Sequence, residues 1–248
     1  MIQFGLIGYP LTHSFSKSFF SEKFRRENID AGYENFEIEK ISLLPDIIKN
    51  NQKLAGLNVT IPYKEQVIAF LDELDDDAAK IGAVNTIKIY RHDNKYSLKG
   101  YNTDIRGFEN SLKPLLKSYH KKALILGTGG ASKAIKYVLK KLKIKYISAS
   151  IEELKDKEIH YEDIDEKMIN QRLLIINATP LGTYPKTDSF PPIPYEFISK
   201  KHLLFDLVYN PGVTRFMEKG KSKGAVVKNG YEMLVLQALK SYEIWNKK

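Results

Sequence analysis

The sequence predicts an α/β protein with mostly parallel sheets. Strand-like and helix-like segments alternate along all 248 residues, as they do in α/β layers. Near the middle of the chain, at 123–142, a continuous apolar strand passes through a glycine-rich turn into an amphipathic helix, and such apolar runs suit strands that are buried on both faces. The length suits two modest domains or one large domain, since domains commonly contain about 100 to 200 residues.

The composition excludes several classes of protein. The chain has no cysteine, which rules out disulfides, thiolate catalysis and cysteine-ligated metal clusters, and we expect no metal site of another kind. Hydrophobic residues make up 43% of the chain, enough for a sizeable core, but no stretch approaches the ~20 apolar residues of a membrane span. The first residues read as a strand instead of a signal segment. We therefore expect a soluble, cytoplasmic protein.

The net charge of +9 raises the question of nucleic-acid binding. Only six of the 39 basic residues are arginines, although base and phosphate recognition favours the bidentate arginine fork. The lysines are scattered, and several surround the polar side and end of one helix, as on a solvated face: Lys136, Lys140, Lys141, Lys143 and Lys145. We expect no nucleic-acid partner and interpret the charge as an attraction for anionic small molecules.

The N-terminal part is predicted to fold as strands and helices in alternation. The first helix carries Phe19, Phe20 and Phe24, and Pro62 is well placed as the first residue of a later helix. The predicted elements are a strand at 2–7, a helix at 17–28, a strand at 33–38, a helix at 43–49, a strand ending at Asn58 and Thr60, a helix from Pro62, strands at 83–90 and 96–101 joined as a hairpin by 92–95, and a long helix after Asp104.

The C-terminal part is predicted to form a parallel sheet whose strand ends carry polar residues. Strands are expected at 123–126, 145–149, 173–176 and 203–208, helices after the glycine turn and at 231–246, and a polar segment without clear periodicity at 151–171. Asn177, Thr179, Asp206 and Tyr209 lie at or just beyond strand ends. Ligands of open α/β sheets bind at the carboxyl ends of the strands, so we expect a binding crevice there.

The glycine turn is a candidate phosphate site. Gly127, Gly129 and Gly130 let the backbone approach a pyrophosphate closely, and the start of the following helix favours negative charge. The dinucleotide fingerprint G-x-G-x-x-G/A is incomplete, because Ser132 stands at its last position. A tight structural connection is the alternative, and the buried strand and amphipathic helix on either side favour the nucleotide interpretation.

Lys64 is a candidate catalytic residue. It follows Pro62 in GLNVTIPYK and is expected in the first turn of a helix, where the dipole repels a cation. Such a broken rule often marks a functional site, because the dipole and any burial would favour the neutral amine and ease proton exchange. An exposed lysine that bends toward water is the alternative.

Polar residues at three further places in the chain have a structural interpretation, and at the first of these places there is also a functional one. Ser14 and Ser16 are ordinary helix caps, or together they bind a carboxylate or a polyhydroxy ligand. Thr103 or Asp104 is an ordinary cap of the long helix. Asn85 lies within a predicted strand, where asparagine is disfavoured, so we expect its side chain to have a polar partner.

Taken together, these segments closely resemble the shikimate dehydrogenase family. The matching motifs follow the family's order along the whole chain, and the ordered set is highly specific: Ser14-Phe15-Ser16, Asn58 to Lys64, Gly82 to Thr86, Asn102-Thr103-Asp104, Gly127 to Ser132, Asn177 to Gly182, Val208 to Pro211 and Gly230 to Gln237. The resemblance implies reversible reduction of 3-dehydroshikimate to shikimate with a nicotinamide cofactor, normally NADPH. It also implies a substrate domain at 1–104 plus 230–248 and a Rossmann-like dinucleotide domain at 105–229.

The resemblance also implies a role for each matching residue. Lys64 and Asp104 act as a catalytic pair at the reacting hydroxyl. The expected substrate-binding residues are Ser14, Ser16, Asn58, Thr60, Asn85, Tyr209 and Gln237. The expected cofactor-binding residues are Gly127, Thr128, Gly129, Gly130, Ala131, Ser132, Ser148, Ser150, Thr179, Leu207 and Gly230.

The chain departs from the family at the adenosine side of the cofactor. The family usually carries an Asn-Arg-Thr type motif after the second strand of the cofactor domain, whose arginine holds the 2'-phosphate of NADP. Here the chain reads Ile147-Ser148-Ala149-Ser150-Ile151, with neither that arginine nor the aspartate that would favour NAD. Ser148, Ser150 and nearby lysines such as Lys155 offer weaker contacts. NADP is therefore the expected cofactor and NAD an open possibility.

Three alternative functions stay open at this point: a quinate or dual quinate/shikimate dehydrogenase that uses NAD, a non-catalytic ligand sensor of the same fold, and a basic nucleic-acid module. From the sequence we expect either a monomer or a homodimer.

Overall fold

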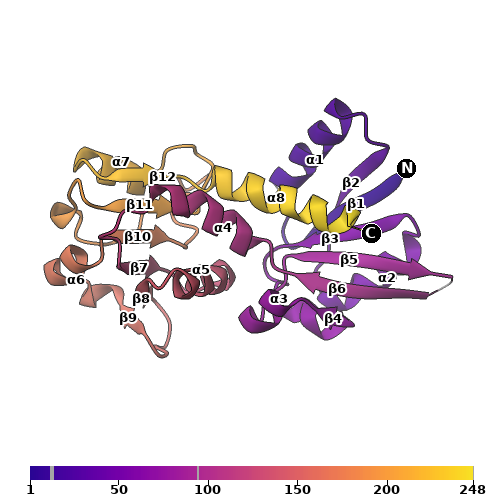
Figure 1. Cartoon of the computed structure of the whole chain (residues 1–248), viewed down its shortest axis with the longest axis horizontal. Coiled ribbons are helices and arrows are strands. Elements are labelled where there is room, and N and C mark those ends of the chain that lie inside the picture. Colours follow the sequence, from indigo (N-terminus) through magenta and orange to yellow (C-terminus); the bar gives the residue numbers. More distant parts are fainter. Residues whose placement is uncertain (12–13, 94, 248) are drawn as a thin grey trace. The chain divides into compact units, whose positions relative to one another are not determined.

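The computed structural model describes residues 1–11, 14–93 and 95–247. The chain forms two compact units, Met1–Thr103 with Ala238–Lys248 and Asp104–Gln237, and each contains one six-stranded sheet (Figure 1). The α/β fold class is therefore confirmed. The chain returns from the second unit to the first between Gln237 and Ala238, inside the last helix. The domain boundary predicted at residue 230 lies N-terminal to this point.

The first unit contains a mixed sheet. Its strands lie in the order β2-β1-β3-β5-β6-β4, with β1 parallel to β2 and β3, and with β5 antiparallel to β3 and β6. Their bounds are β1 Ile2–Gly8, β2 Ala31–Glu37, β3 Leu54–Val59, β4 Glu73–Leu74, β5 Thr86–His92 and β6 Lys95–Tyr101. The predicted hairpin is confirmed as the β5–β6 pair, although its turn residue Asn94 lies outside the described residues.

The helices of the first unit pack on this sheet, two of them through aromatic side chains. They are α1 Phe15–Arg26, α2 Leu44–Asn50, α3 Asp76–Ile81 and the end of α8 Tyr231–Asn246. Phe4 of β1 stacks on Trp245 of α8 at 4.6 Å, and Phe20 of α1 stacks on Tyr33 at 4.8 Å. A side chain at Gly56 would meet the Trp245 ring, so glycine there lets α8 pack directly on β3.

The second unit contains a fully parallel sheet in the order β9-β8-β7-β10-β11-β12. This is the strand order 3-2-1-4-5-6 of dinucleotide-binding folds, in which the ligand binds where the order reverses, here between β7 and β10. The strands are β7 Lys122–Leu126, β8 Lys145–Ser150, β9 Glu158–His160, β10 Leu174–Asn177, β11 Leu203–Asp206 and β12 Val226–Lys228.

The second unit's helices are α4 Asp104–Leu112, α5 Gly130–Lys141, α6 Glu166–Gln171, α7 Arg215–Ser222 and the first part of α8. β7, β10 and β11 are buried along almost their entire length, as their continuous apolar runs predict. The segment at 151–171 also contains β9 and α6, which its polar sequence did not reveal. Among the described residues, no helix is long and apolar enough to cross a membrane.

One predicted element is wrong. A helix was expected from Pro62, but residues 61–65 form turns, and a short 3-10 helix follows at Gln66–Phe70. Lys64 therefore does not lie in the first turn of an α-helix, and the argument from the helix dipole does not apply to it. The Lys64 carbonyl instead accepts a hydrogen bond from Val84 N at 2.7 Å, a residue distant in the sequence.

Two buried histidines predict a pH-dependent stability of the second unit. His202 is 1% exposed; its Nδ1 accepts from Ser199 N at 3.0 Å, and its Nε2 lies 3.1 Å from the Ile169 carbonyl. His120 has the same arrangement with Lys117 N and the Lys201 carbonyl. Burial lowers the pKa of both histidines below the usual value, because the protein interior disfavours the charged ring.

We expect His202→Gln to destabilise the protein by about 2 kcal/mol at pH 8, where the neutral ring keeps its hydrogen bonds. A lowered folded-state pKa means that this contribution is present above the unfolded pKa of about 6.5 and is lost as the pH falls through the folded value. The difference between variant and wild type in urea denaturation should therefore shrink at pH 5.5. The exposed His92→Gln is the control, and a difference that does not change with pH would contradict the assignment.

Candidate active site

The glycine turn lies where the strand order of the second unit reverses. Gly127 follows β7 with φ +100°, a conformation that favours glycine. A side chain there would lie 2.8 Å from Thr179 Cγ2 and 3.3 Å from the carbonyl of Ala178. The turn after β7 is therefore in contact with the loop after β10, at the place where ligands of such sheets bind.

The next two glycines have a different reason to be glycine. A Cβ atom at Gly129 or Gly130 would have nothing within 4 Å, so packing of the described residues does not require glycine there. Gly129 precedes α5 without a side-chain cap, and the first N–H groups of a helix lack partners within it. Open space beside these N–H groups fits a pyrophosphate.

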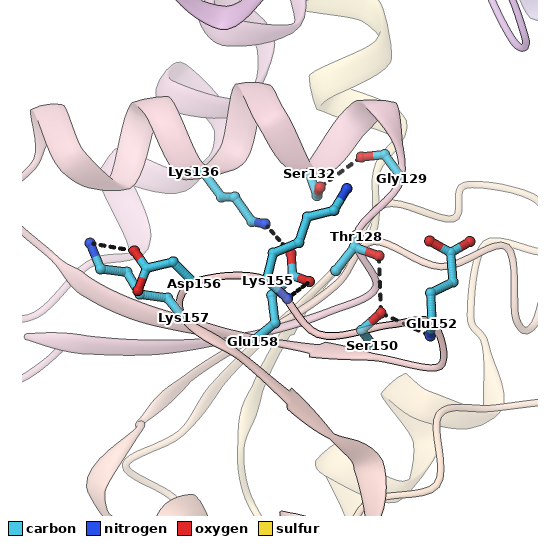
Figure 2. A network of polar contacts seen from close by, with 10 residues as sticks. All are labelled: Thr128, Gly129, Ser132, Lys136, Ser150, Glu152, Lys155, Asp156, Lys157 and Glu158. Atoms are coloured by element: carbon cyan, nitrogen blue, oxygen red, sulfur yellow. Dashed lines mark hydrogen bonds and ion pairs between the residues drawn. The ribbon is translucent and has the colours of Figure 1, made fainter.

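Ser132 closes the first turn of α5 instead of facing outward. Its hydroxyl donates to the Gly129 carbonyl at 2.6 Å, and the side chain is fully buried (Figure 2). Ala131 lies beside it and is half-buried. Any contact of Ser132 with a cofactor would thus come from its backbone, while its side chain fixes the shape of the turn.

The end of β8 lies beside the glycine turn. The Ser150 and Thr128 hydroxyls are 3.4 Å apart, and Ser150 Oγ accepts from Glu152 N at 3.0 Å (Figure 2). Ser148 is also on β8, but its side chain is fully buried and its hydroxyl has no hydrogen-bond partner among the described residues. Of the two predicted serines, Ser150 is therefore the one placed next to the turn.

The loop between β8 and β9 carries mixed charge. The Glu158 side chain is 5% exposed and accepts from Lys136 Nζ at 3.1 Å and from Lys155 N at 3.1 Å, which anchors the loop to α5. The Lys155 side chain extends from this loop toward the first turn of α5 (Figure 2). Ile151 is 89% exposed. Lys155 is therefore the cationic side chain of this loop that is directed toward the glycine turn.

The ends of β10 and β11 are joined by buried hydrogen bonds. Asn177 Nδ2 donates to Asp206 Oδ1 at 2.9 Å, and Asn177 Oδ1 accepts from the Thr179 hydroxyl at 2.6 Å. Gly230 packs directly against the Leu207 carbonyl, which leaves no room for a side chain. The predicted cofactor residues Thr179, Leu207 and Gly230 thus belong to one packed region of the second unit.

In the first unit, two predicted substrate residues belong to a buried polar network. Asn58 accepts from the Tyr33 hydroxyl at 2.8 Å and donates to Ser241 Oγ at 2.9 Å. Asn85 Oδ1 accepts from Thr103 N at 2.7 Å, which confirms the expectation that Asn85 has a polar partner. The Thr86 hydroxyl lies 2.8 Å from Ser241 Oγ, so the network joins β3, β5 and the end of α8.

The remaining substrate candidates of the first unit lie near the ends of β1 and β3. Ser14 caps α1, with its hydroxyl accepting from Lys17 N at 3.1 Å, as its structural interpretation predicts. Ser16 is buried in the first turn of α1. Thr60 and Lys64 are half-buried, and Thr60 N donates to the Ile7 carbonyl at 3.0 Å.

The second unit carries the other three candidates. Asp104 is the first residue of α4 and is buried. Tyr209 is half-buried, and burial raises the pKa of its phenol. Gly107 of α4 approaches the Met233 carbonyl and Gln237 of α8 closely, since a Cβ atom there would lie 2.5 Å and 3.2 Å from them. Asp104 and Gly107 share one helix face, so Asp104 lies on the side of α4 that faces α8.

Sequence reasoning missed the residues that hold these candidates in place. Thr86, Thr214 and Ser241 were not singled out, and Asp206 was noted only as a strand end. The available signal was a hydrophilic residue inside an apolar run, as at Asp206. No group of three or more histidines and carboxylates that could hold a metal occurs within the described ranges.

Comparisons with known proteins identify the family of this chain. The family model for the shikimate dehydrogenase substrate binding domain matches residues 6–87. The chain is 42% identical to the shikimate dehydrogenase (NADP(+)) of Clostridium beijerinckii, over 98% of this chain and 91% of that protein.

Two solved structures are also similar over nearly the whole chain. Shikimate dehydrogenase 1 from Peptoclostridium difficile has a TM-score of 0.85 at 41% identity, covering 99% of this chain and 91% of that one. Shikimate 5-dehydrogenase from Thermus thermophilus, in complex with NADP(H) and shikimate, has a TM-score of 0.83 at 27% identity, covering 99% and 94%. The chain therefore belongs to the shikimate dehydrogenase family, with a Rossmann-like second unit.

Proposed function

We propose that this chain catalyses the reversible, NADPH-dependent reduction of 3-dehydroshikimate to shikimate in aromatic amino acid biosynthesis. The observation that carries the proposal is an open glycine turn, at the strand-order reversal of a dinucleotide-binding sheet, in a chain whose relatives are named shikimate dehydrogenase (NADP(+)). The first unit would bind the substrate and the second the dinucleotide. We expect the enzyme to act in the cytoplasm, as a monomer or a homodimer.

The second unit fits the dinucleotide. The backbone of Gly129, Gly130 and Ala131 at the start of α5 would hold the pyrophosphate, and Thr128 and Ser150 would lie toward the adenosine ribose. Thr179, Leu207 and Gly230 would contact the nicotinamide half. When bound, the cofactor supplies the hydride that the substrate carbonyl carbon receives.

Lys64 and Asp104 would serve the oxygen of the same carbonyl. Charge develops on this oxygen when the carbon is reduced, and the Lys64 ammonium would stabilise the charge and then transfer a proton to the oxygen. The Asp104 carboxylate would orient both the ammonium and the hydroxyl that results. These two roles follow the family's motif positions.

The polar residues near the strand ends would recognise the substrate. Ser14 and Ser16 would bind its carboxylate together with Tyr209, and the amides and hydroxyls of Asn58, Thr60, Asn85 and Gln237 would bind its hydroxyl groups. The network around Asn58 and Asn85 supports this assignment, because it fixes both amides before any ligand binds.

Removing the Lys64 amine should slow the chemical step more than it weakens binding. We expect Lys64→Ala to lower kcat at least ~100-fold, the usual scale of general acid–base catalysis, while the Kd for shikimate changes only a few-fold. Asp104→Asn should also lower kcat more than it weakens shikimate binding. The control is Lys53→Ala, which replaces an exposed lysine of the first unit. Normal turnover by Lys64→Ala would remove Lys64 from the chemistry, and tight shikimate binding by a wild type without turnover would indicate a ligand sensor.

Cofactor preference is the second measurable consequence. We propose that Lys155 provides the positive charge for the 2'-phosphate, in place of the missing arginine. An exposed ion pair is worth up to about 1 kcal/mol, so Lys155→Ala should weaken NADPH binding about threefold to fivefold and leave NADH unchanged. Lys167→Ala, an exposed lysine on α6, is the control. Equal losses for both cofactors would exclude this role, and a wild type that prefers NADH and oxidises quinate would favour the NAD-dependent alternative.

A further inference from the structure

Asp206 is a buried carboxylate that the proposed chemistry does not use. It ends β11 and is 0% exposed. Its Oδ1 accepts from Asn177 Nδ2 at 2.9 Å and from Val208 N at 3.0 Å, and its Oδ2 accepts from the Thr214 hydroxyl at 2.5 Å. A buried carboxylate is costly unless such donors surround it, so an acidic residue here needs an explanation beyond packing.

One arm of this network reaches the glycine turn. Asn177, held through its amide nitrogen by Asp206, accepts through its amide oxygen from Thr179 N at 3.0 Å and from the Thr179 hydroxyl at 2.6 Å. The Thr179 methyl group is the atom closest to the space where a side chain on Gly127 would lie. The carboxylate therefore fixes the loop after β10, and this loop sets the wall of the turn.

The other arm reaches the loop after β11. Asp206 binds the Val208 N–H, while Leu207 N donates to the Asn177 carbonyl at 2.9 Å. The Leu207 carbonyl in turn packs directly on Gly230. Thr214 anchors the carboxylate from the far side, because its hydroxyl also caps α7 by accepting from Met217 N at 3.3 Å.

We propose that Asp206 is a positioning residue, whose ionised carboxylate holds the loops after β10 and β11 in the arrangement that binds the nicotinamide half of the dinucleotide. This inference rests on the proposed function. Asp206 itself touches neither substrate nor cofactor in this proposal. The carboxylate acts through Asn177 and Thr179 on one side and through Val208 and Leu207 on the other.

The ionisation of Asp206 falls within an accessible pH range. Burial raises its pKa to about 6, against the lowering effect of its three hydrogen bonds. The titratable or charged groups on neighbouring elements are engaged elsewhere. The Tyr195 phenol donates to the Pro191 carbonyl, and Lys219 lies over the Tyr195 ring. Arg215 pairs with Asp188 and Glu218, and Lys228 pairs with Glu232.

The test is the affinity of Asp206→Asn for NADPH and for NADH, measured by fluorescence titration of the full chain between pH 5 and 8. Asparagine keeps the shape but loses the charge that strengthens three hydrogen bonds, so we expect binding to weaken about tenfold at pH 8. The 2'-phosphate of NADPH itself titrates near pH 6, and the ratio of variant to wild-type Kd at each pH cancels this contribution. The ratio should fall toward one at pH 5, where wild-type Asp206 is also neutral.

Thermal unfolding separates positioning from a purely structural role. A raised folded-state pKa means that ionisation of Asp206 lowers stability as the pH rises from the unfolded pKa of about 3.9 to the folded value of about 6, and the full cost is present above it. Asparagine carries no such cost, so Asp206→Asn should melt no lower than wild type at pH 8 although it binds the cofactor more weakly. Asp75→Asn makes the same chemical change at a carboxylate that caps α3 in the first unit, and it should leave both Kd values unchanged.

The outcomes are distinguishable. A wild type that binds neither NADPH nor NADH would overturn the proposed function itself. Normal wild-type binding with a Kd ratio near one at every pH would overturn the role of Asp206. A ratio that stays high at pH 5 would also overturn it, because the loss would then not depend on the charge. If Asp206→Asn fails to fold, Thr214→Val gives the second test. This variant removes one hydrogen-bond donor to the carboxylate and should weaken the binding of both NADPH and NADH about threefold or more.

Discussion

The close contact between Gly127 and Thr179 is the constraint on which the second unit depends. The first strand of the parallel sheet must turn into α5 at the point where its neighbour β10 ends, and only a residue without a side chain fits at φ +100° against Thr179. This contact brings the start of α5 and the loop after β10 together at the reversal of strand order. The space beside Gly129 and Gly130 is open, and the packing of the described residues does not use it, as the proposed dinucleotide site requires.

Each unit has a buried polar network that fixes the residues expected to touch ligand. In the first unit, Asn58 and Asn85 are held by hydroxyls from strands and from the end of α8. In the second unit, Asp206 and Asn177 hold the loops at the strand ends. A buried polar network in which every group has a hydrogen-bond partner makes its side chains rigid. Both proposed binding surfaces are therefore shaped before a ligand binds.

The sequence predicted the features that depend on neighbouring residues. The glycine turn, the apolar strands and the β5–β6 hairpin each have a local signature, and all three occur where expected. The helix from Pro62 was wrong because proline is favoured in turns as well as at helix starts. The Lys64 carbonyl accepts a hydrogen bond from Val84 N, which is distant in the sequence. No local pattern could indicate that hydrogen bond.

The site was only partly predictable for the same reason. The family motifs identified the residues expected to touch ligand, but their supports come from distant positions: Ser241 lies 183 residues from Asn58, and Asp206 lies 29 from Asn177. Burial also distinguishes residues that look alike in sequence. Ser148 and Ser150 are two positions apart on one strand, yet the Ser150 hydroxyl contacts Thr128 and that of Ser148 is enclosed.

We infer above all that the glycines at the start of α5 exist for the dinucleotide, and Gly130→Val tests this most directly. Valine meets no described atom within 4 Å of its Cβ position and is a better helix former than glycine, so the variant should unfold at the same temperature as wild type or higher. Its side chain would occupy the pyrophosphate space, and we predict loss of NADPH binding in a calorimetric titration. NADPH binding at wild-type affinity by the folded variant would contradict this role of the glycines.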